Sequence, residues 1–359
     1  MTDLSIIVPV YNGEQYLAQL LDSICAICCT TIEVVMVNDG SSDGSENIIK
    51  KYQEKDSRIK YFPKENGGIV SARNYGLERA IGKYLFFADQ DDKVDAHTIE
   101  KAIQRLEEEK ADMLLFSTEH FNDIGRQWPC DTVYEDGSFD ENEIADLFIR
   151  KLVTRYTKKE VVSYLGHIWA AIIRRDMVQE QGIHFKRFMA IEDDLLFVLD
   201  SLDYSKKLLT MKESGYYWRQ NPSSRTRRSV YCENMADKKK LYYEYRTDVL
   251  KRHGVCTEEE FRDYCIGVRQ EFMLDMLDNE AILGIKSIVK SEQLLKNYLE
   301  DLQIKEAMQS KPMCPLARRY SVEMKLLMQS RCKSALLYKK LKYAKSSVGN
   351  WMRRKRHEI

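Results

Sequence analysis

Residues 5–10, with the sequence Ser-Ile-Ile-Val-Pro-Val, decide the fold class of this chain. A short apolar run rich in β-branched residues is typical of a strand that is buried on both faces of a sheet. Helical and strand-like patterns then alternate along the chain. The later strand-like runs are Ile32–Asp39, Ile59–Phe62, Lys83–Asp89 and Asp112–Ser117. This alternation predicts an α/β fold with a Rossmann-like, mostly parallel sheet that is flanked by helices.

Polar residues follow three of these strands at the point where each strand ends. They are Tyr11, Asn12, Asn38, Asp39 and the run Asp-Gln-Asp-Asp at 89–92. Ligands of parallel sheets bind beyond the carboxyl ends of the strands, so we expect these side chains to lie at one edge. Three carboxylates within four residues repel one another. The run at 89–92 is therefore either a solvated acidic turn or a site for a hard divalent cation.

The composition is that of an ordinary globular chain. Of the 359 residues, 44% are hydrophobic, and 56 Lys and Arg balance 56 Asp and Glu, so net charge indicates no class of partner. The start of the chain lacks the apolar region of a signal peptide. No apolar run reaches the roughly 18 residues that a membrane span requires. We therefore expect a cytoplasmic protein.

Nine cysteines, an odd number, favour reduced thiols over a disulfide framework. Cys25 and Cys28 form a C-x-x-C pattern, and Cys29 follows directly. This pattern is either half of a redox or zinc site or a set of buried structural cysteines. The second interpretation is favoured because no other C-x-x-C or histidine pair accompanies it.

The alternating pattern weakens after Ser117, and the polar stretch Asn122–Asn142 is interpreted as a long loop or insertion. A second system of helices and strands covers about 143–229, and the pattern is helical from Tyr231 onward. We place a domain boundary near residue 230. The predicted domains are residues 1–229, with the sheet, and residues 230–359, an all-helical C-terminal region.

Five sequence blocks in this order resemble the family 2 inverting glycosyltransferases of the bacterial cell-surface polysaccharide type, which have the GT-A fold. The blocks are SIIVPVYNGEQYL (5–17), VVMVNDGSSDGS (34–45), ENGGIVSARNYGLERAIGKYLFFADQDD (65–92), IEDDLLF (191–197) and YYWRQNPSSRT (216–226). The resemblance covers about residues 3–228. It implies transfer of a sugar from a nucleotide sugar, most simply a UDP-sugar, to an acceptor hydroxyl.

The resemblance also assigns a donor site. It implies that Asp91, the last acid of a DxD motif, binds Mn²⁺ or Mg²⁺, and that Asp89 lies near the ribose and the metal. Asp39 would accept a hydrogen bond from uracil N3–H. The other implied nucleotide contacts are Tyr11 by stacking, the backbone of Pro9 and Val10, and Arg73. The structural alternatives are an Asx turn at Asp39 and a surface salt bridge at Arg73.

The catalytic base implied by the resemblance is Asp193, with Glu192 and Asp194 in support near the acceptor. A carboxylate opposite the leaving group would take the proton of the acceptor hydroxyl as its oxygen attacks the sugar. The alternative for these acids is a favourable interaction with a helix start. Arg219 and Ser224 would bind the diphosphate or line a loop over the donor. His167 and Trp169 occupy the acceptor position, where a packed Trp169 is the alternative.

Two other functions remain open. Residues 40–44 match G-x-S-x-G, so Ser42 with Asp193 and His253 would satisfy the residue order of a serine hydrolase. That function leaves the acids at 89–92 and Asp39 unexplained. The second alternative is a degenerate protein that binds nucleotide sugar or membrane without turnover.

The C-terminal segment 331–359 carries ten Lys and Arg against a single acid, Glu358, with apolar residues between the charges. Such a pattern predicts a basic amphipathic helix on the anionic inner leaflet of a membrane. A solvated helical tail is the alternative, and no motif indicates nucleic-acid binding. The helices could also pair in a homodimer. The sequence thus predicts a cytoplasmic, peripherally membrane-associated glycosyltransferase that acts on a lipid-linked glycan.

Overall fold

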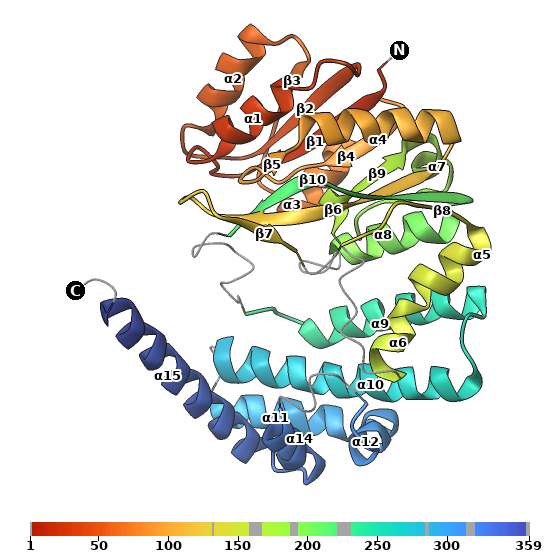
Figure 1. Ribbon diagram of the computed structural model, residues 1–359. Coiled ribbons are helices and arrows are strands. Elements are labelled where there is room, and N and C mark those ends of the chain that lie inside the picture. The colour runs from red at the N-terminus through yellow and green to blue at the C-terminus, as the bar shows by residue number, and fades with distance from the viewer. Residues whose placement is uncertain are drawn as a thin grey trace. The chain divides into compact units, whose positions relative to one another are not determined.

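The structure is a computed structural model that describes residues 2–130, 133–157, 167–186, 193–220, 231–283, 287–313 and 320–356; side chains 155–157, 193, 283 and 345–356 are not described. The chain divides into two units (Figure 1). The sheet unit comprises residues 1–149 and 163–222. The helical unit comprises residues 150–162 and 223–359, so a short segment from within the first predicted domain groups with the C-terminal helices.

A ten-stranded sheet forms the centre of the sheet unit. Its strands, in the order in which neighbours are hydrogen-bonded, are β3 (Ile59–Lys64), β2 (Ile32–Asp39), β1 (Leu4–Val10), β4 (Tyr84–Phe87), β9 (Ala171–Arg174), β6 (Met113–Phe121), β10 (Lys207–Arg219) and β5 (Lys93–Val94). The first four strands are mutually parallel, as are β6 and β10. Strand β9 is antiparallel to both of its neighbours. The predicted mostly parallel sheet is confirmed.

Helices cover both faces of this sheet (Figure 1). They are α1 (Leu17–Cys25), α2 (Ser45–Lys55), α3 (Ile69–Leu77), α4 (Ala96–Glu109), α5 (Glu141–Ile144), η1 (Ala145–Ile149), η2 (Ile168–Ala170), α7 (Arg175–Glu180) and α8 (Asp193–Tyr204). Alternate residues of β1, such as Ile6, pack with α1 and α4 in the main core. Ile7 faces α3, where a Cβ on Gly76 would lie 2.5 Å from Ile7 Cγ2. Glycine therefore lets α3 lie directly on the strand.

The stretch Asn122–Asn142 contains two strands, so its interpretation as a loop is wrong in part. Strand β7 (Gln127–Pro129) pairs antiparallel with β6, and β8 (Gly137–Asp140) pairs antiparallel with β10. Strands of three and four residues are too short to show an alternating pattern in the sequence. These two strands can be recognised only from their pairing with β6 and β10.

Strand β3 is one outer strand of the sheet and pairs only with β2 along the path of described strands. Lys60 and Pro63 on this strand are exposed. Proline has no N–H to offer to a further strand, and lysine places a charge at the edge. The free side of β3 is therefore poorly suited to further pairing.

The helical unit is entirely helical where it is described, as predicted. It contains α6 (Lys151–Thr157), α9 (Met235–His253), α10 (Glu258–Asp278), η4 (Asn279–Leu283), α11 (Ile288–Leu299), α12 (Leu302–Gln309), α14 (Ser321–Met328) and α15 (Cys332–Arg356). A capping box between Thr257 and Glu260 starts α10. Within the described ranges, no helix has the length and apolar character needed to cross a membrane.

The C-terminal helix α15 is only partly free of the helical unit. Leu336 is fully buried, and the buried Lys339 pairs with Asp278 at 2.5 Å. Leu337 and Leu341 are exposed. The predicted helix is present, but its first turns use one apolar face for packing.

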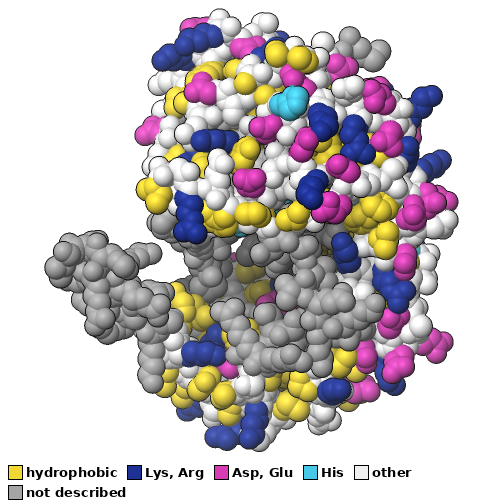
Figure 2. All heavy atoms as spheres, viewed as in Figure 1, with side chains coloured by type: hydrophobic (Ala, Val, Ile, Leu, Met, Phe, Trp, Pro, Cys, Tyr) yellow, Lys and Arg dark blue, Asp and Glu magenta, His cyan; other side chains and the backbone are white. Residues whose placement is uncertain are grey.

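Charged side chains are mixed over the face of the sheet unit seen in Figure 2. Lys and Arg alternate there with Asp and Glu, so this face has no stripe of a single sign such as binds a phosphate backbone. This distribution agrees with the equal numbers of basic and acidic residues.

Candidate functional site

Hydrogen bonds tie the loop after β1 to the loop after β2. The Asn12 amide donates to Ser41 Oγ at 3.0 Å, and the Ser42 amide donates to Asn12 Oδ1 at 2.8 Å. The Glu14 amide donates to Asp43 Oδ2 at 3.0 Å. The G-x-S-x-G loop thus orders the start of the site through its backbone and its polar side chains, which accounts for its composition without a hydrolase nucleophile.

A second link joins the β1 loop to the acidic run after β4. The Tyr11 amide donates to Gln90 Oε1 at 2.8 Å, and Gln90 Nε2 donates to the Tyr11 carbonyl at 3.0 Å. The Tyr11 side chain is 38% exposed, so its ring is accessible for the predicted stacking. Pro9 and Val10 are buried in β1, so any ligand contact they make has to use their backbone. That contact stays a prediction.

Asp39 is the most thoroughly positioned of the predicted nucleotide-binding residues. Its side chain is 3% exposed and accepts from Lys64 Nζ at 2.5 Å, the Gly67 amide at 2.9 Å and the Gly68 amide at 2.8 Å. These partners lie across the β3–α3 connection, so the contact is not an Asx turn. An ionised carboxylate offers about four acceptor positions, and three are in use. Among the described residues, none uses the fourth position.

The three acids of the 89–92 run occupy different environments. Asp92 is 1% exposed and accepts from the Arg219 amide and from the Tyr216 hydroxyl, both at 2.7 Å. Burial raises the pKa of Asp92 well above its usual value, and neighbouring Asp91 adds to this effect. The Tyr216 oxygen also accepts from the Asp89 amide at 2.9 Å. Asp92 therefore fixes the shape of the acidic loop against β10.

Asp91 has the properties of a metal ligand. Burial, followed by the nearby charge of Asp89, raises the pKa of Asp91 to about 6. The hydrogen bond of its own amide and the charge of Arg219 only partly offset this rise. Asp89 pairs with Arg73, and Asp92 accepts from Tyr216. A divalent cation would offset the charge repulsion between this half-buried carboxylate and the acid beside it, and oxygen donors suit Mg²⁺ and Mn²⁺. The residues present therefore fit the implied metal.

Arg73 connects two motifs that lie far apart in the sequence. Its guanidinium is 4% exposed, pairs with Asp89 Oδ1 at 3.1 Å and also donates to Asp194 Oδ1. The Phe185 ring lies beneath it, 5.3 Å from Cζ. The salt bridge at Arg73 is thus buried, and its described contacts are structural. The approach of Arg73 to the base or phosphates stays a prediction.

Arg219 is likewise held inside the protein. Its Nε donates to the Asp91 carbonyl at 2.6 Å, and its terminal nitrogens donate to Asp123 Oδ1 and Gln19 Oε1. The Tyr16 ring lies 4.3 Å from its Cζ. Through the Asp91 carbonyl, Arg219 holds the backbone of the acidic loop in place. A direct contact with a diphosphate stays a prediction, because the described hydrogen bonds already occupy all three guanidinium nitrogens.

The acids near residue 193 are only partly described. Asp193 is the first residue of α8, and Asp194 bonds to Arg73. The side chain of Asp193, and the whole of Glu192 and Ser224, lie outside the described residues. Helix α8 therefore brings its first turn to the acidic loop, through Asp194.

An aromatic cluster lies beside the acidic loop, and most of it was not foreseen. The rings of His167 and Tyr216 both stack with Trp169, with ring centroids 4.3 and 4.9 Å away. Trp218 and His120 extend the cluster. Trp169 is 4% exposed, so the packed alternative is the one observed. Burial lowers the pKa of His167 to about 4. The aromatic run 216–218 was the available sequence signal.

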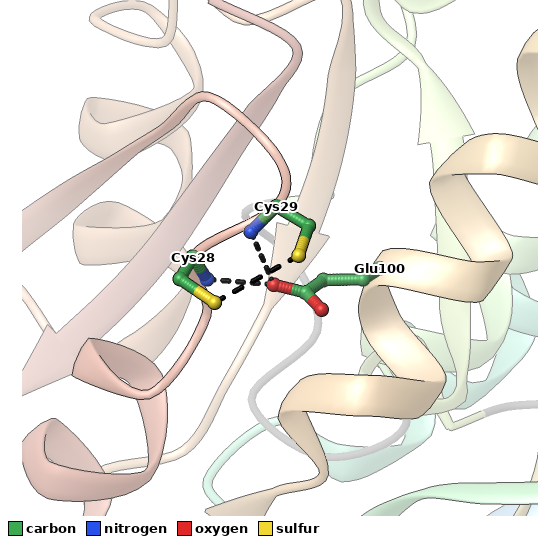
Figure 3. Close-up of side chains that lie close together, drawn as sticks. All are labelled: Cys28, Cys29 and Glu100. Atoms are coloured by element: carbon green, nitrogen blue, oxygen red, sulfur yellow. Dashed lines mark hydrogen bonds between the residues drawn. The ribbon is translucent and has the colours of Figure 1, made fainter.

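Two of the three cysteines at or after the end of α1 differ from expectation. Cys25 is half-buried, but Cys28 and Cys29 are exposed. The prediction of buried structural cysteines is wrong for this last pair, because α1 ends at Cys25 and the pair lies in the following loop. Both thiols lie beside Glu100 of α4 (Figure 3).

Comparison with known proteins identifies relatives of this chain. An uncharacterized glycosyltransferase, EpsJ, of Bacillus subtilis is 26% identical over 223 residues, which are 62% of each chain. The minor teichoic acid biosynthesis protein GgaB of Bacillus subtilis is 33% identical over 220 residues, 60% of this chain and 23% of that protein. The matched region spans less than two thirds of either relative.

Solved structures show the same fold. The crystal structure of Staphylococcus aureus TarS 1-349 in complex with UDP-GlcNAc matches with a TM-score of 0.60 and 20% identity, and the match covers 96% of this chain and 92% of that one. The predicted GT-A fold is confirmed. Residues 5–180 also match the family model of glycosyl transferase family 2. The protein therefore contains a glycosyl transferase family 2 domain.

Proposed function

We propose that this protein transfers a sugar from a UDP-sugar to an acceptor hydroxyl with inversion at the sugar carbon. The family 2 domain supports glycosyl transfer, and the TarS structures in complex with UDP and UDP-GlcNAc support the choice of nucleotide. The observation that carries the proposal is the position of Arg73 between Asp89 and Asp194. It brings the start of α8, where the expected base lies, to the acidic loop.

The donor nucleotide is bound by the loops after β1 and β2. The remaining acceptor position of Asp39 takes the uracil N3–H, and the exposed Tyr11 ring stacks on the base. Gln90 fixes the Tyr11 backbone to the acidic loop, so base and diphosphate sites keep a constant separation. Asp91 holds Mn²⁺ or Mg²⁺ with Asp89 beside it. A cation there supplies positive charge to the departing diphosphate.

Asp193 is the base in this proposal. It takes the proton of the acceptor hydroxyl while the acceptor oxygen bonds to the sugar carbon, and the electrons of the breaking bond leave with the diphosphate. Asp194 is already paired with the cationic Arg73, which stabilises its ionised form and makes it the poorer proton acceptor. Asp194 is therefore assigned a positioning role.

The donor is identified by thermal shift with UDP-, GDP-, dTDP- and CMP-sugars, each with and without Mn²⁺. A ligand at 100 times its Kd stabilises the protein by about 2.7 kcal/mol. We expect a Mn²⁺-dependent shift with a UDP-sugar that Asp91→Asn removes. A shift with no nucleotide would contradict the proposal. A shift without any transfer or donor hydrolysis would instead indicate the degenerate, binding-only protein.

The acceptor in this proposal is a lipid-linked surface glycan, with α15 near the membrane. Support comes from the basic residues of 331–359 and from the exposed Leu337 and Leu341. Each Lys or Arg near an anionic surface contributes about 1 kcal/mol to binding. Sedimentation with anionic vesicles should retain the protein, and replacing residues 353–356 with glutamine should release it. Equal retention by neutral vesicles would contradict the electrostatic part of the proposal.

A further inference from the structure

Cys28, Cys29 and Glu100 form a compact cluster on the sheet unit (Figure 3). The two sulfur atoms lie 3.8 Å apart. Glu100 Oε1 accepts from the Cys28 and Cys29 amides, each at 2.6 Å, so the carboxylate is anchored beside both thiols. The two sulfurs and a carboxylate oxygen all lie within 4.8 Å of one another. Three groups that can bind a metal are thus already assembled.

The spacing matches the coordination of a tetrahedral ion. Zn²⁺ bonds thiolate sulfur at about 2.3 Å and carboxylate oxygen at about 2.1 Å, so two thiolates on one ion lie about 3.8 Å apart. The observed sulfur separation already has this value. Two sulfurs in ordinary contact lie at a similar distance, so the anchored carboxylate is the feature that makes the cluster a ligand set. The two sulfurs and the Glu100 carboxylate offer three of the four positions of a tetrahedral ion.

We propose that Cys28, Cys29 and Glu100 bind a thiophilic divalent cation such as Zn²⁺, with water at the fourth position. Sulfur ligands favour this class of ion over Mg²⁺ and Mn²⁺. The cluster lies just before β2, which starts at Ile32, and so at the amino ends of the parallel strands. It is separate from the acidic loop, which follows the carboxyl end of β4. The ion ties the α1–β2 loop to α4.

Binding of Zn²⁺ at this cluster is coupled to the release of protons from the thiols. The pKa of the Cys29 thiol is raised, first by its hydrogen bond with Cys28 and then by that neighbour's charge. Backbone hydrogen bonds, that from Cys29 being the largest contribution, lower the pKa of Glu100, so the carboxylate is ionised without a metal. Each thiol releases its proton to solvent as its sulfur bonds to the cation. Affinity for Zn²⁺ should therefore rise with pH.

The test is competition for Zn²⁺ between the reduced full-length protein and a colorimetric chelator. We expect one equivalent whose affinity falls at least about tenfold in Cys28→Ser, Cys29→Ser and Glu100→Gln, since even residues that only support a ligand contribute about that much. Glu100→Gln keeps an oxygen that can accept from both amides, so the fold should persist. Alkylation of Cys28 and Cys29, followed by mass spectrometry, should slow when Zn²⁺ is present.

Cys25→Ser is the matched control, because Cys25 belongs to the C-x-x-C pattern but not to the cluster. It should bind Zn²⁺ like the wild type. Equal loss in Cys25→Ser and Cys28→Ser would overturn the ligand set in favour of the C-x-x-C pair. Wild-type affinity in all three cluster variants, or no protection of the two thiols, would overturn the site itself. Neither readout depends on glycosyl transfer.

Discussion

The two edges of the parallel sheet offer different ligands. At the carboxyl ends of the strands the candidate ligands are carboxylate oxygens: Asp39, which accepts from backbone amides, follows β2, and Asp89 and Asp91 follow β4. Near the amino end of β2, two sulfurs and one carboxylate lie close together, and the carboxylate accepts from two backbone amides. Oxygen ligands suit hard cations and thiolates suit softer ones, so the two edges should select different metals. The comparison teaches that ligand type, more than net charge, distinguishes the sites.

Asp193→Asn has the largest expected effect. It tests whether the transfer reaction takes place at the carboxyl ends of the strands. Loss of a general base should lower the rate of transfer by about 10²–10⁴-fold and leave donor affinity unchanged. The measurement is turnover of the UDP-sugar found by thermal shift. Asp194→Asn is the matched variant and should lose less, because this residue is assigned to positioning. A greater loss in Asp194→Asn would exchange the two roles.

Arg73→Met tests how the carboxyl edge is held together. Removing one partner of a buried ion pair costs about 3–5 kcal/mol, because Asp89 and Asp194 would lose their shared cation. Denaturant unfolding measures the change. Lys101→Met, which breaks an exposed pair with Glu213, should cost less than about 1 kcal/mol. Equal effects of the two variants would show that the buried link contributes no special stability.

Tyr216→Phe removes the hydroxyl that joins Asp89 and Asp92. A buried acceptor left without its donor costs about 1–3 kcal/mol of folding stability. The acidic loop should also hold Mn²⁺ less well, so the metal-dependent thermal shift should shrink. Zn²⁺ binding at the amino edge should be unaffected. Loss of both metal responses would show that the two edges are not independent.

His167→Phe should change how stability depends on pH. Burial lowers the folded-state pKa of His167 to about 4 from 6.5, so the unfolded chain binds this proton first as pH falls. The stability contribution is present above pH 6.5 and is lost progressively toward pH 4, by about 1.4 kcal/mol at about pH 5.5. Asp89 favours the protonated ring and His120 opposes it. In the variant, the free energy of unfolding, measured by denaturant unfolding at several pH values in this range, should depend less on pH.

Much of the fold could be predicted because it depends on local pattern. The first four parallel strands and the polar residues that follow them are visible as short apolar runs and their ends. The contacts that organise the site are not local: Arg73 bonds to a residue 121 positions away, and Arg219 to one 200 positions away. Such pairs depend on strand order and register, which residue spacing does not reveal. The Cys29 to Glu100 contact, 71 positions apart, was missed for the same reason.

Side-chain roles were harder to predict than side-chain positions. Asp89, Asp91 and Asp92 were expected at the right place, but their environments differ because Tyr216 and Arg219 on β10 reach only some of them. The burial of Trp169, which favours a packing role, was likewise not visible in the sequence. The roles of Asp39, Asp91 and Asp193, the metal and the membrane contact stay predictions that the experiments above test.

The outer strand β3 has a consequence for self-association. Its exposed Pro63 and Lys60 would meet any second copy of the chain that tried to continue the sheet from this side. Missing donors and charge repulsion both oppose such an extension. A homodimer of this protein would therefore have to join through another surface, and partly unfolded chains would find no template for aggregation along this edge.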